Sequence, residues 1–422
     1  MSTILTGASQ VVTCRGAARA RHGPEMADLN VVDDGSVVIG DSGRIEAVGP
    51  YSELRKQHPD ANIDEVSGVL FPGFVDCHTH AVFGAARLAD HERRARGISY
   101  KEIAAAGGGI LASVNDVRGR DVSELVDLMK ARIAALAANG TTTVEVKSGY
   151  GLKLETELAQ LEAIRQASTD DGPDLITTFL GAHEVPPEAR DDPDSYVSLV
   201  VEEMLPAVSR QGIARFCDVF CEPGVFTIEQ SRTVLEAARQ HGLRLKLHAD
   251  EIDYSGGAEL AAELDAVSAD HLAAVSEAGI ATLSGSSTVA VLLPGTMLFL
   301  GSRHQAPARR LIDAGVAVAL ATDFNPGSSP GLSLPLMATL GVSQMGMIPA
   351  ETIVAITVNA AAAVGEAETR GQIESGYRAD LVLAAVRDWR ELPYWYGVNL
   401  ISEVWIQGVA CHSREWPVNC LG

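Results

Sequence analysis

The sequence predicts an α/β protein: a (β/α)8 barrel with a small composite β-sandwich domain built from both chain ends. Two observations support this prediction. From about residue 70, eight short apolar runs alternate with helical patterns, and strand-like segments with tight turns occur at both ends of the chain. An open, doubly wound sheet is the alternative, because it uses the same alternation of strands and helices.

The eight runs have the length and the aliphatic composition of buried parallel strands. They cover residues 70–76, 142–147, 175–180, 216–221, 243–247, 266–269, 288–293 and 316–321. Helical patterns at 123–139 and 227–241 are each followed by a glycine, Gly140 and Gly242, and Thr227 is a plausible N-cap. The first two runs start about 70 residues apart, so we expect the extra segment 81–120 to lie over the barrel mouth.

The two chain ends carry strand patterns of a different kind. Residues 36–40 and 44–49 flank a turn at 41–43, and residues 380–386 and 403–410 follow the last helical patterns. We therefore predict that residues 1–69 and 366–422 form the small β domain together. The barrel would occupy residues 70–365.

Composition limits the possible partners. The chain has 422 residues and a net charge of −22, which disfavours nucleic acid and anionic membrane surfaces. No apolar run of about 18 residues and no secretory signal pattern is present in the sequence. Its six cysteines include no CxxC pair, so neither a disulfide framework nor a zinc ribbon is expected. The cytoplasm is the expected location.

Four potential metal ligands follow predicted strands. His78 and His80 lie two residues apart after the first run, His248 follows the fifth run and Asp323 the eighth. Side chains two apart on a strand point the same way, and barrel enzymes place their sites at the carboxyl ends of the strands. Imidazole and carboxylate ligands suit zinc or iron. Each residue alone also fits a structural, hydrogen-bonded role, but four at one rim predict a metal site.

This set resembles the amidohydrolase superfamily, which has His-x-His on the first strand, His on the fifth and Asp on the eighth. The pattern Gly371-x-Ile373-x-x-Gly376 near the C-terminus is also similar to that superfamily. Many members bridge two metals with a lysine on the fourth strand, which is absent from 215–222 here. The resemblance therefore implies one zinc or iron ion per chain. Lys147, on the second run, is interpreted as a hydrogen-bonding or structural residue.

The chain resembles the imidazolonepropionase family more closely and over nearly its whole length. The resemblance rests on the motifs at 76–80, 83–84, 100–110, 145–152, 180–183, 248–251 and 322–328. Loop motifs are more specific than the metal set, because loops determine the substrate of a barrel enzyme. The resemblance implies hydrolysis of the ring amide of 4-imidazolone-5-propanoate to N-formimidoyl-L-glutamate. This is a small anionic substrate, and the family also suggests a homodimer.

The same resemblance assigns roles to particular residues. Glu251 would move the proton of the attacking water. His271 would either aid catalysis or hold the residues that do so in place. Arg87 would bind the propanoate. The remaining expected substrate contacts are Glu251, Tyr150, His183, Asn325, Gly327 and Ser328, with Tyr100 a weaker candidate. Arg93, Arg94 and Arg96 are alternative anion-binding residues, although a solvated helix face is the favoured interpretation of these three.

Three further interpretations complete the prediction. Glycines 107–109 could form a phosphate-binding loop, but they follow a helical pattern, so a flexible lid joint is favoured. Another cyclic amidohydrolase or a nucleobase deaminase of the same superfamily is the alternative enzyme, and it would need no propanoate-binding arginine. A non-catalytic barrel scaffold is disfavoured because all four predicted metal ligands are present.

Overall fold

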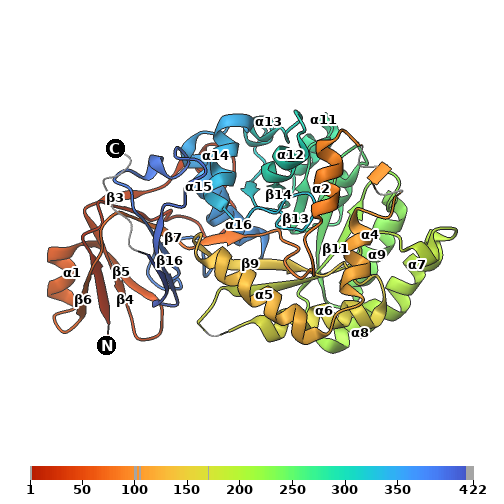
Figure 1. The fold of residues 1–422 in the computed structure, drawn as a ribbon. Helices are drawn as coiled ribbons and strands as arrows, with labels where there is room; N and C mark the ends of the chain where they lie inside the picture. The colour runs from red at the N-terminus through yellow and green to blue at the C-terminus, as the bar shows by residue number, and fades with distance from the viewer. Residues whose placement is uncertain (1, 99–101, 104–105, 170, 415–422) are drawn as a thin grey trace.

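The computed structural model describes residues 2–98, 102–103, 106–169 and 171–414. Its centre is a sheet of eight strands, in which each strand pairs in parallel with the next one along the chain (Figure 1). The strands are β8 (Phe74–Asp76), β9 (Thr141–Lys147), β10 (Asp174–Ala182), β11 (Phe216–Cys221), β12 (Arg244–Ala249), β13 (Ser268–His271), β14 (Val289–Leu292) and β15 (Val318–Leu320). This is the predicted barrel, with every run in its predicted place except part of the first.

Closure of the barrel occurs just beyond the ends of β8 and β15. Thr79 forms a parallel bridge with Phe324, the backbone N–H of His80 donates to the Phe324 carbonyl at 2.9 Å, and that of Asp323 to the His78 carbonyl at 3.1 Å. The first and last predicted ligand segments are therefore hydrogen-bonded to each other. Barrel closure itself brings them together.

Helices surround the barrel, and their apolar faces pack on the strands (Figure 1). The predicted helices at 123–139 and 227–241 are α5 (Val122–Ala137) and α9 (Ile228–Gln240), and the Thr227 hydroxyl caps α9 by accepting from the Gln230 N–H. Gly140 and Gly242 follow with φ of +92° and +82°, the left-handed conformation that glycine favours after a helix. The other helices around the barrel are α6 (Leu154–Ala167), α7 (Pro193–Leu199), α8 (Leu205–Gln211), α10 (Gly257–Glu263), α11 (Glu277–Ser284), α12 (Pro294–Leu300), α13 (Ala308–Asp313), α14 (Leu334–Met345), α15 (Pro349–Ile356) and α16 (Val358–Ala363).

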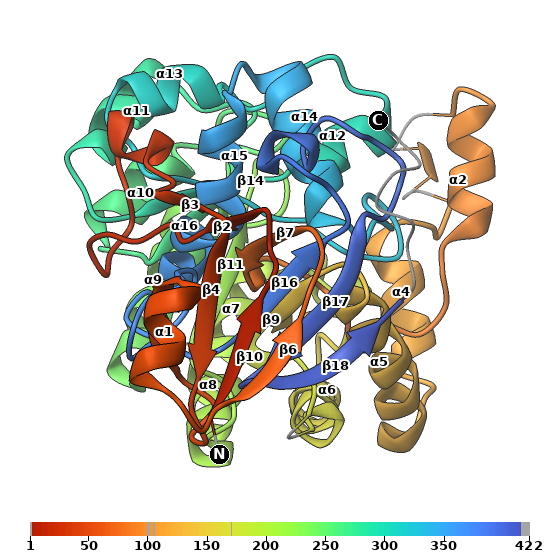
Figure 2. The same ribbon diagram turned by 90° about the vertical axis from the view of Figure 1, so that its left-hand side faces the viewer.

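Both chain ends form the small β domain, as predicted, and Figure 2 shows the red N-terminal strands beside the blue C-terminal ones. One sheet has the order β5-β4-β1-β6 and the other β18-β17-β16-β7-β2-β3. The strands are β1 (Thr3–Thr6), β2 (Gln10–Val12), β3 (Val31–Asp33), β4 (Gly35–Ile39), β5 (Ile45–Pro50), β6 (Asn62–Glu65), β7 (Val69–Pro72), β16 (Leu381–Ala384), β17 (Ile401–Ile406) and β18 (Val409–Ser413). The helix α1 (Tyr51–Gln57) connects β5 to β6. Side chains from both ends of the chain share one apolar core between the sheets.

The run 70–76, expected to be one barrel strand, is divided at Gly73. β7 pairs with β16 and β2 in the small β domain, whereas only β8 belongs to the barrel. At Gly73 an added Cβ would lie 2.2 Å from the Thr142 hydroxyl and 3.0 Å from the Asp380 Cβ. The chain therefore passes between the two domains where only glycine fits.

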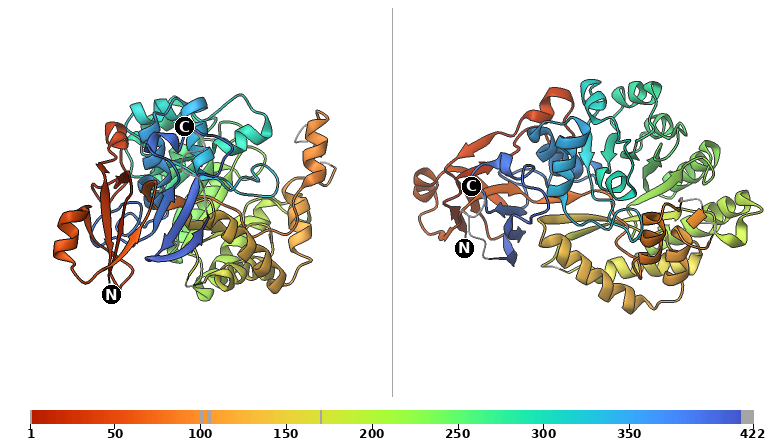
Figure 3. Two further views of the ribbon diagram at one scale, coloured as in Figure 1. Left: turned by 60° about the vertical axis from the view of Figure 1, so that its left-hand side comes forward. Right: turned by 45° about the horizontal axis from the view of Figure 1, so that its top comes forward.

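The long first loop carries α2 (Leu88–Ala95) and α4 (Ile110–Val117), and Figure 3 shows α2 at the side of the barrel away from the small β domain. Our interpretation of glycines 107–109 was wrong in one respect, because they precede α4 directly. The Gly109 N–H donates to the Asp90 carboxylate at 2.8 Å, so an acidic side chain of the protein itself lies at this helix N-terminus. No described helix is long and apolar enough to cross a membrane.

Candidate active site

Three imidazoles and one carboxylate meet at the carboxyl ends of the barrel strands. The Nε2 atoms of His78 and His80 lie 3.6 Å and 3.5 Å from Asp323 Oδ1, and His248 Nε2 lies 3.4 Å from His80 Nε2. His78 and His80 follow β8, His248 lies on β12 and Asp323 follows β15. All four residues are at most 3% exposed. The structure thus brings the four predicted ligands together.

The cluster has unsatisfied hydrogen-bonding capacity. Among the described residues His78 Nε2 has no hydrogen-bond partner, although it is buried, and His248 Nε2 faces His80 Nε2 at 3.4 Å. A buried polar atom without a partner costs about 1–3 kcal/mol. A cation bound between these atoms would remove that cost, so the donor set fits a metal ion such as zinc or iron.

Carboxylates and a hydroxyl behind the cluster orient it. His78 Nδ1 donates to Asp270 Oδ2 at 2.6 Å, and His248 Nδ1 lies 2.9 Å from Asp218 Oδ2. With Nδ1 directed at a carboxylate, each ring turns its Nε2 toward the centre of the cluster. The Thr296 hydroxyl holds the other oxygen of Asp323 at 2.6 Å.

The sequence analysis missed these supporting residues. Asp218 interrupts an otherwise apolar strand and Asp270 directly precedes His271, and an isolated charge inside a buried strand is the signal that could have revealed both. Thr296, on α12, offers no comparable pattern.

Burial sets the protonation of the cluster. It lowers the pKa values of His78 and His80 well below the usual range, and Lys147 and His183 respectively lower them further. Burial raises the pKa of Asp323 to about 6, because the charged carboxylate loses its hydration. The imidazoles of His78 and His80 are therefore neutral at pH 7, the form that coordinates metals.

Glu251 and His271 face each other beside the cluster. Glu251 Oε2 lies 3.6 Å from His271 Nε2, and burial, together with the negative charges of Asp323 and Glu222, raises the Glu251 pKa well above its ordinary value. His271 has no hydrogen-bond partner on either ring nitrogen among the described residues, and its φ is +78°. Backbone strain of this kind concentrates at functional sites.

Glu222, directly after β11, fixes the loop that carries Glu251. Its carboxylate accepts the backbone N–H groups of Glu251 at 3.2 Å and Asp253 at 2.7 Å. These bonds occupy both Glu222 oxygens. The geometry gives Glu222 a role in holding the Glu251 loop.

A cavity of about 460 Å³ opens directly onto the cluster. The predicted site residues that line it are His80, Arg87, Tyr150, His183, His248, Glu251, His271, Asp323, Asn325 and Ser328. Apolar side chains from several loops complete the wall, among them Ile98, Ile110, Phe220, Ile252 and Leu300. The cavity is therefore an apolar pocket with a few polar groups at its base, which is typical of a small-molecule site.

Arg87 brings a positive charge to the wall of this cavity. It precedes α2, its backbone N–H donates to the Pro326 carbonyl, and its buried Nε has no acceptor among the described residues. An added Cβ on Gly327 would lie 1.4 Å from Arg87 Nη2. Gly327 therefore leaves the space that the guanidinium occupies.

The other expected substrate contacts form two groups. His183 Nδ1 bonds to the Gly149 carbonyl at 3.0 Å, its ring stacks on His80 with centroids 5.0 Å apart, and burial lowers its pKa to about 3. Asn325 Oδ1 accepts the N–H groups of Gly327 and Ser328 at 2.8 and 2.7 Å, which shapes the turn after β15. Tyr150 lies beside His183, and Tyr100 lies outside the described residues.

The three alternative arginines are not equivalent. Arg93 lies 3.6 Å from Asp90, and Arg96 pairs with Glu92 on the helix surface. Arg94 differs from the prediction of a solvated face, because it lines the cavity and donates to the Gly327 carbonyl at 2.8 Å. The turn of α2 places one of every three or four side chains inward, which sequence proximity could not distinguish.

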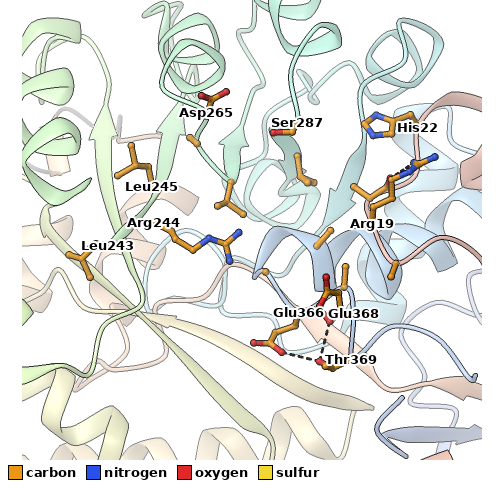
Figure 4. Close-up of a pocket in the computed structure, with 18 of the residues that line it drawn as sticks. Arg19, His22, Leu243, Arg244, Leu245, Asp265, Ser287, Glu366, Glu368 and Thr369 are labelled. Carbon is orange, nitrogen blue, oxygen red and sulfur yellow. Dashed lines mark hydrogen bonds between the residues drawn. The ribbon is translucent and has the colours of Figure 1, made fainter. Parts of the chain in front are cut away.

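A larger cavity, of about 890 Å³, lies at the other end of the barrel, where β12, β13 and β14 begin (Figure 4). Two of its charged groups have ionic partners within the protein: Arg19 pairs with Glu25, and Glu366 pairs with Arg215. Arg244 lies over the ring of Phe216, 5.2 Å from its centroid. This cavity contains no cluster of the kind that lies at the strand ends.

Comparison with known proteins agrees with this geometry. The model of the amidohydrolase family matches residues 69–411, and that of the bacterial imidazolonepropionase-like composite domain matches residues 41–61. An imidazolonepropionase of Geobacillus kaustophilus is 48% identical over 398 residues, 93% of each chain, and one of Parabacteroides distasonis is 47% identical over 95% of this chain and 96% of its own. This chain belongs to the imidazolonepropionase family.

Solved structures share the fold of the imidazolonepropionase family at low identity. A triazine hydrolase variant superposes with a TM-score of 0.76 at 18% identity, covering 99% of this chain and 96% of its own. A guanine deaminase of E. coli superposes with a TM-score of 0.72 at 15% identity, covering 98% and 100%. These likenesses support the barrel with its small β domain and say nothing about the substrate.

Proposed function

We propose that this chain hydrolyses the ring amide of 4-imidazolone-5-propanoate to N-formimidoyl-L-glutamate, a step of histidine degradation. Family membership identifies it as a metal-dependent hydrolase of a cyclic amide. The observation that carries the proposal is that one cavity joins the histidine cluster, Glu251 and Arg87. Such a cavity offers a place for the reacting carbonyl, a group that moves protons and a cation for the substrate's carboxylate.

His78, His80, His248 and Asp323 would hold one metal ion per chain, zinc or iron. Neutral imidazole nitrogens and one carboxylate oxygen are the ligands that these metals favour. A bound ion of this kind lowers the pKa of its water to about 7 and polarises a carbonyl, which an amide at neutral pH requires. Potential ligand atoms of His78, His80 and Asp323 all lie within 4.8 Å of one another, and so do those of His78, His248 and His271. His78 therefore links the two groups.

Glu251 would carry the proton through the reaction. The attacking water loses a proton to its carboxylate as the new C–O bond forms, and that proton passes to the ring nitrogen as the C–N bond breaks. Burial raises the Glu251 pKa well above its ordinary value, which makes its carboxylate a stronger base toward the proton of the water. His271, 3.6 Å away, would support Glu251 and face the reacting carbonyl.

Arg87 would bind the propanoate. A guanidinium and a carboxylate form two parallel charge-assisted hydrogen bonds, and this geometry fixes the substrate's orientation as well as its affinity. Tyr150, His183, Asn325, Gly327 and Ser328 would surround the rest of the ring and chain. The chain's net charge of −22 repels an anion, so a local cation is needed for its capture.

The deciding experiment supplies 4-imidazolone-5-propanoate to the purified protein and follows the loss of its ultraviolet absorbance. We expect turnover that a chelator abolishes and that added zinc or iron restores. A parallel assay with guanine and adenine tests the deaminase alternative. Ammonia release from a nucleobase, without turnover of the imidazolone, would overturn the proposal. The predicted homodimer and cytoplasmic location stay predictions, which sedimentation and cell fractionation would test.

A further inference from the structure

A buried ionic network fills the barrel directly beneath the histidine cluster. Lys147 Nζ lies 2.8 Å from Asp218, 2.9 Å from Glu145 and 3.6 Å from Asp270, and Lys246 Nζ lies 2.7 Å from Glu145. All five side chains are 0% exposed. Barrel interiors are normally filled by branched aliphatic side chains, so ions in this layer need an explanation.

Two of these carboxylates are the ones that orient the histidines. Asp270 Oδ2 accepts from His78 Nδ1, and the same oxygen faces Lys147; Asp218 Oδ2 lies against His248 Nδ1 and also accepts from Lys147. Lys147 is thus the shared cation of both carboxylate–histidine pairs. The four residues of these two pairs come from three different strands, β11, β12 and β13, and from the segment after β8.

We propose that Lys147 is a positioning residue for the metal site. Its ammonium holds Asp218 and Asp270 together, and they in turn hold His248 and His78 with Nε2 facing the metal. Without that cation the two carboxylates repel each other in a buried space, and the imidazoles lose their fixed orientation. This inference rests on the proposed function, because it takes those histidines to be metal ligands.

Lys246 provides a matched comparison. It is equally buried, but its ammonium bonds to the Glu145 carboxylate and the Cys77 carbonyl, at 2.7 and 3.0 Å, and to neither Asp218 nor Asp270 among the described residues. Its charge acts on Asp270, where burial raises the pKa and both lysines lower it, so the two lysines differ in the bond to Asp218. Any general effect of removing a buried ammonium from this layer should therefore occur in both lysine variants. Positioning of His248 through Asp218, to which Lys147 is bonded and Lys246 is not, should be lost only in the Lys147 variant.

The direction of the change in metal affinity distinguishes the loss of histidine positioning from the simple loss of a positive charge. Removing a positive charge close to a metal cation reduces repulsion, so electrostatics alone predicts tighter metal binding in both variants. Loss of an outer partner of a metal-ligating histidine typically weakens metal affinity by about 10–100-fold. The two explanations thus predict opposite changes in metal affinity when Lys147 is replaced.

The test measures Zn²⁺ affinity of the full-length apoprotein by competition with a chromophoric chelator, in the absence of substrate. We expect Lys147→Met to weaken Zn²⁺ binding about 10–100-fold, whereas Lys246→Met binds Zn²⁺ at least as tightly as the wild type. Circular dichroism and the melting temperature of each apoprotein report the fold. Wild-type or tighter affinity in folded Lys147→Met, or equal weakening in both variants, would overturn the proposal.

A charge-balanced pair of variants keeps the test valid if Lys147→Met does not fold. Glu145→Gln combined with Lys147→Met removes one charge of each sign, and Glu145→Gln combined with Lys246→Met is its control. The same difference in Zn²⁺ affinity is expected between these two. His248→Ala measured alongside distinguishes the two levels of inference: if it retains wild-type Zn²⁺ affinity, the proposed metal site fails, whereas its loss with unaffected Lys147 variants refutes only the role of Lys147.

Discussion

The two ends of the barrel differ in how their polar groups are satisfied. At the end where β12, β13 and β14 begin, the larger cavity contains charged side chains that pair within the protein, such as Arg19 with Glu25. At the carboxyl ends, the cavity of about 460 Å³ has only about half the volume, yet buried nitrogens of His78 and His271 lack partners among the described residues. Volume alone would have selected the wrong end.

This contrast shows what marks a functional site physically. Folding normally satisfies buried polar groups, because each unsatisfied one costs about 1–3 kcal/mol. Several such groups around one point therefore indicate a ligand that the chain is built to receive. The φ of +78° at His271, a left-handed conformation that non-glycine residues rarely adopt, also occurs at the carboxyl ends.

The largest expected effect tests the contrast directly. His248→Ala should abolish metal retention and activity while the barrel stays folded, because the side chain lies at the strand ends and a rim ligand contributes little to core packing. Arg244→Ala, in the larger cavity, should keep both. Elemental analysis and steady-state kinetics on the two proteins would measure this. Activity that survives in His248→Ala and disappears in Arg244→Ala would reverse the assignment of the two ends.

Glu251→Gln should lower kcat by about 10²–10⁴ with metal still bound, since Gln keeps the shape of Glu but cannot accept the proton. Kinetics together with metal analysis separate loss of chemistry from loss of metal. A variant with near-normal kcat would transfer the role of base to His271.

Arg87→Ala should chiefly raise KM, because the carboxylate that it binds does not react. Truncating one partner of a desolvated charge pair costs about 2–5 kcal/mol, and part of this cost would also lower kcat through poorer positioning of the ring. Arg96→Ala, on the same helix and paired with Glu92 at the surface, is the control. An unchanged KM in Arg87→Ala would direct attention to Arg94, which also lines the cavity.

Gly327→Ala should have the smallest effect, a KM increase of roughly tenfold, because the guanidinium is displaced but not removed. The added Cβ would lie 1.4 Å from Arg87 Nη2, so the arginine must move. Gly331→Ala is a matched control in the same loop, since an added Cβ there meets nothing within 4 Å. Equal kinetics in the two alanine variants would show that the position of Arg87 does not limit binding.

The metal content of the purified protein tests the predicted number of ions per chain. We expect about one zinc or iron ion per chain, because no lysine interrupts β11 and Glu222 is occupied by backbone N–H groups. Elemental analysis of protein purified without chelator measures the ratio. Two tightly held ions per chain would contradict the single-ion prediction.

Local patterns were enough to predict the barrel, the composite small β domain and the candidate residues at the strand ends. Strand alternation, the glycines after α5 and α9 and the Thr227 cap are local signals, which depend on neighbouring residues and survive without knowledge of the fold. The spacing of His78 and His80 is local in the same sense. These features were predictable because their causes lie within a few residues.

Which charges meet depends on contacts between segments that lie far apart in the chain. Gly73 divides a continuous apolar run because Thr142 and Asp380 approach it from distant segments, and Lys147 joins Asp218 to Asp270 across the barrel. Such contacts link residues far apart in the chain, and hydrophobic periodicity carries no information about them. Burial then fixes their consequences, because charges removed from water must find partners in three dimensions.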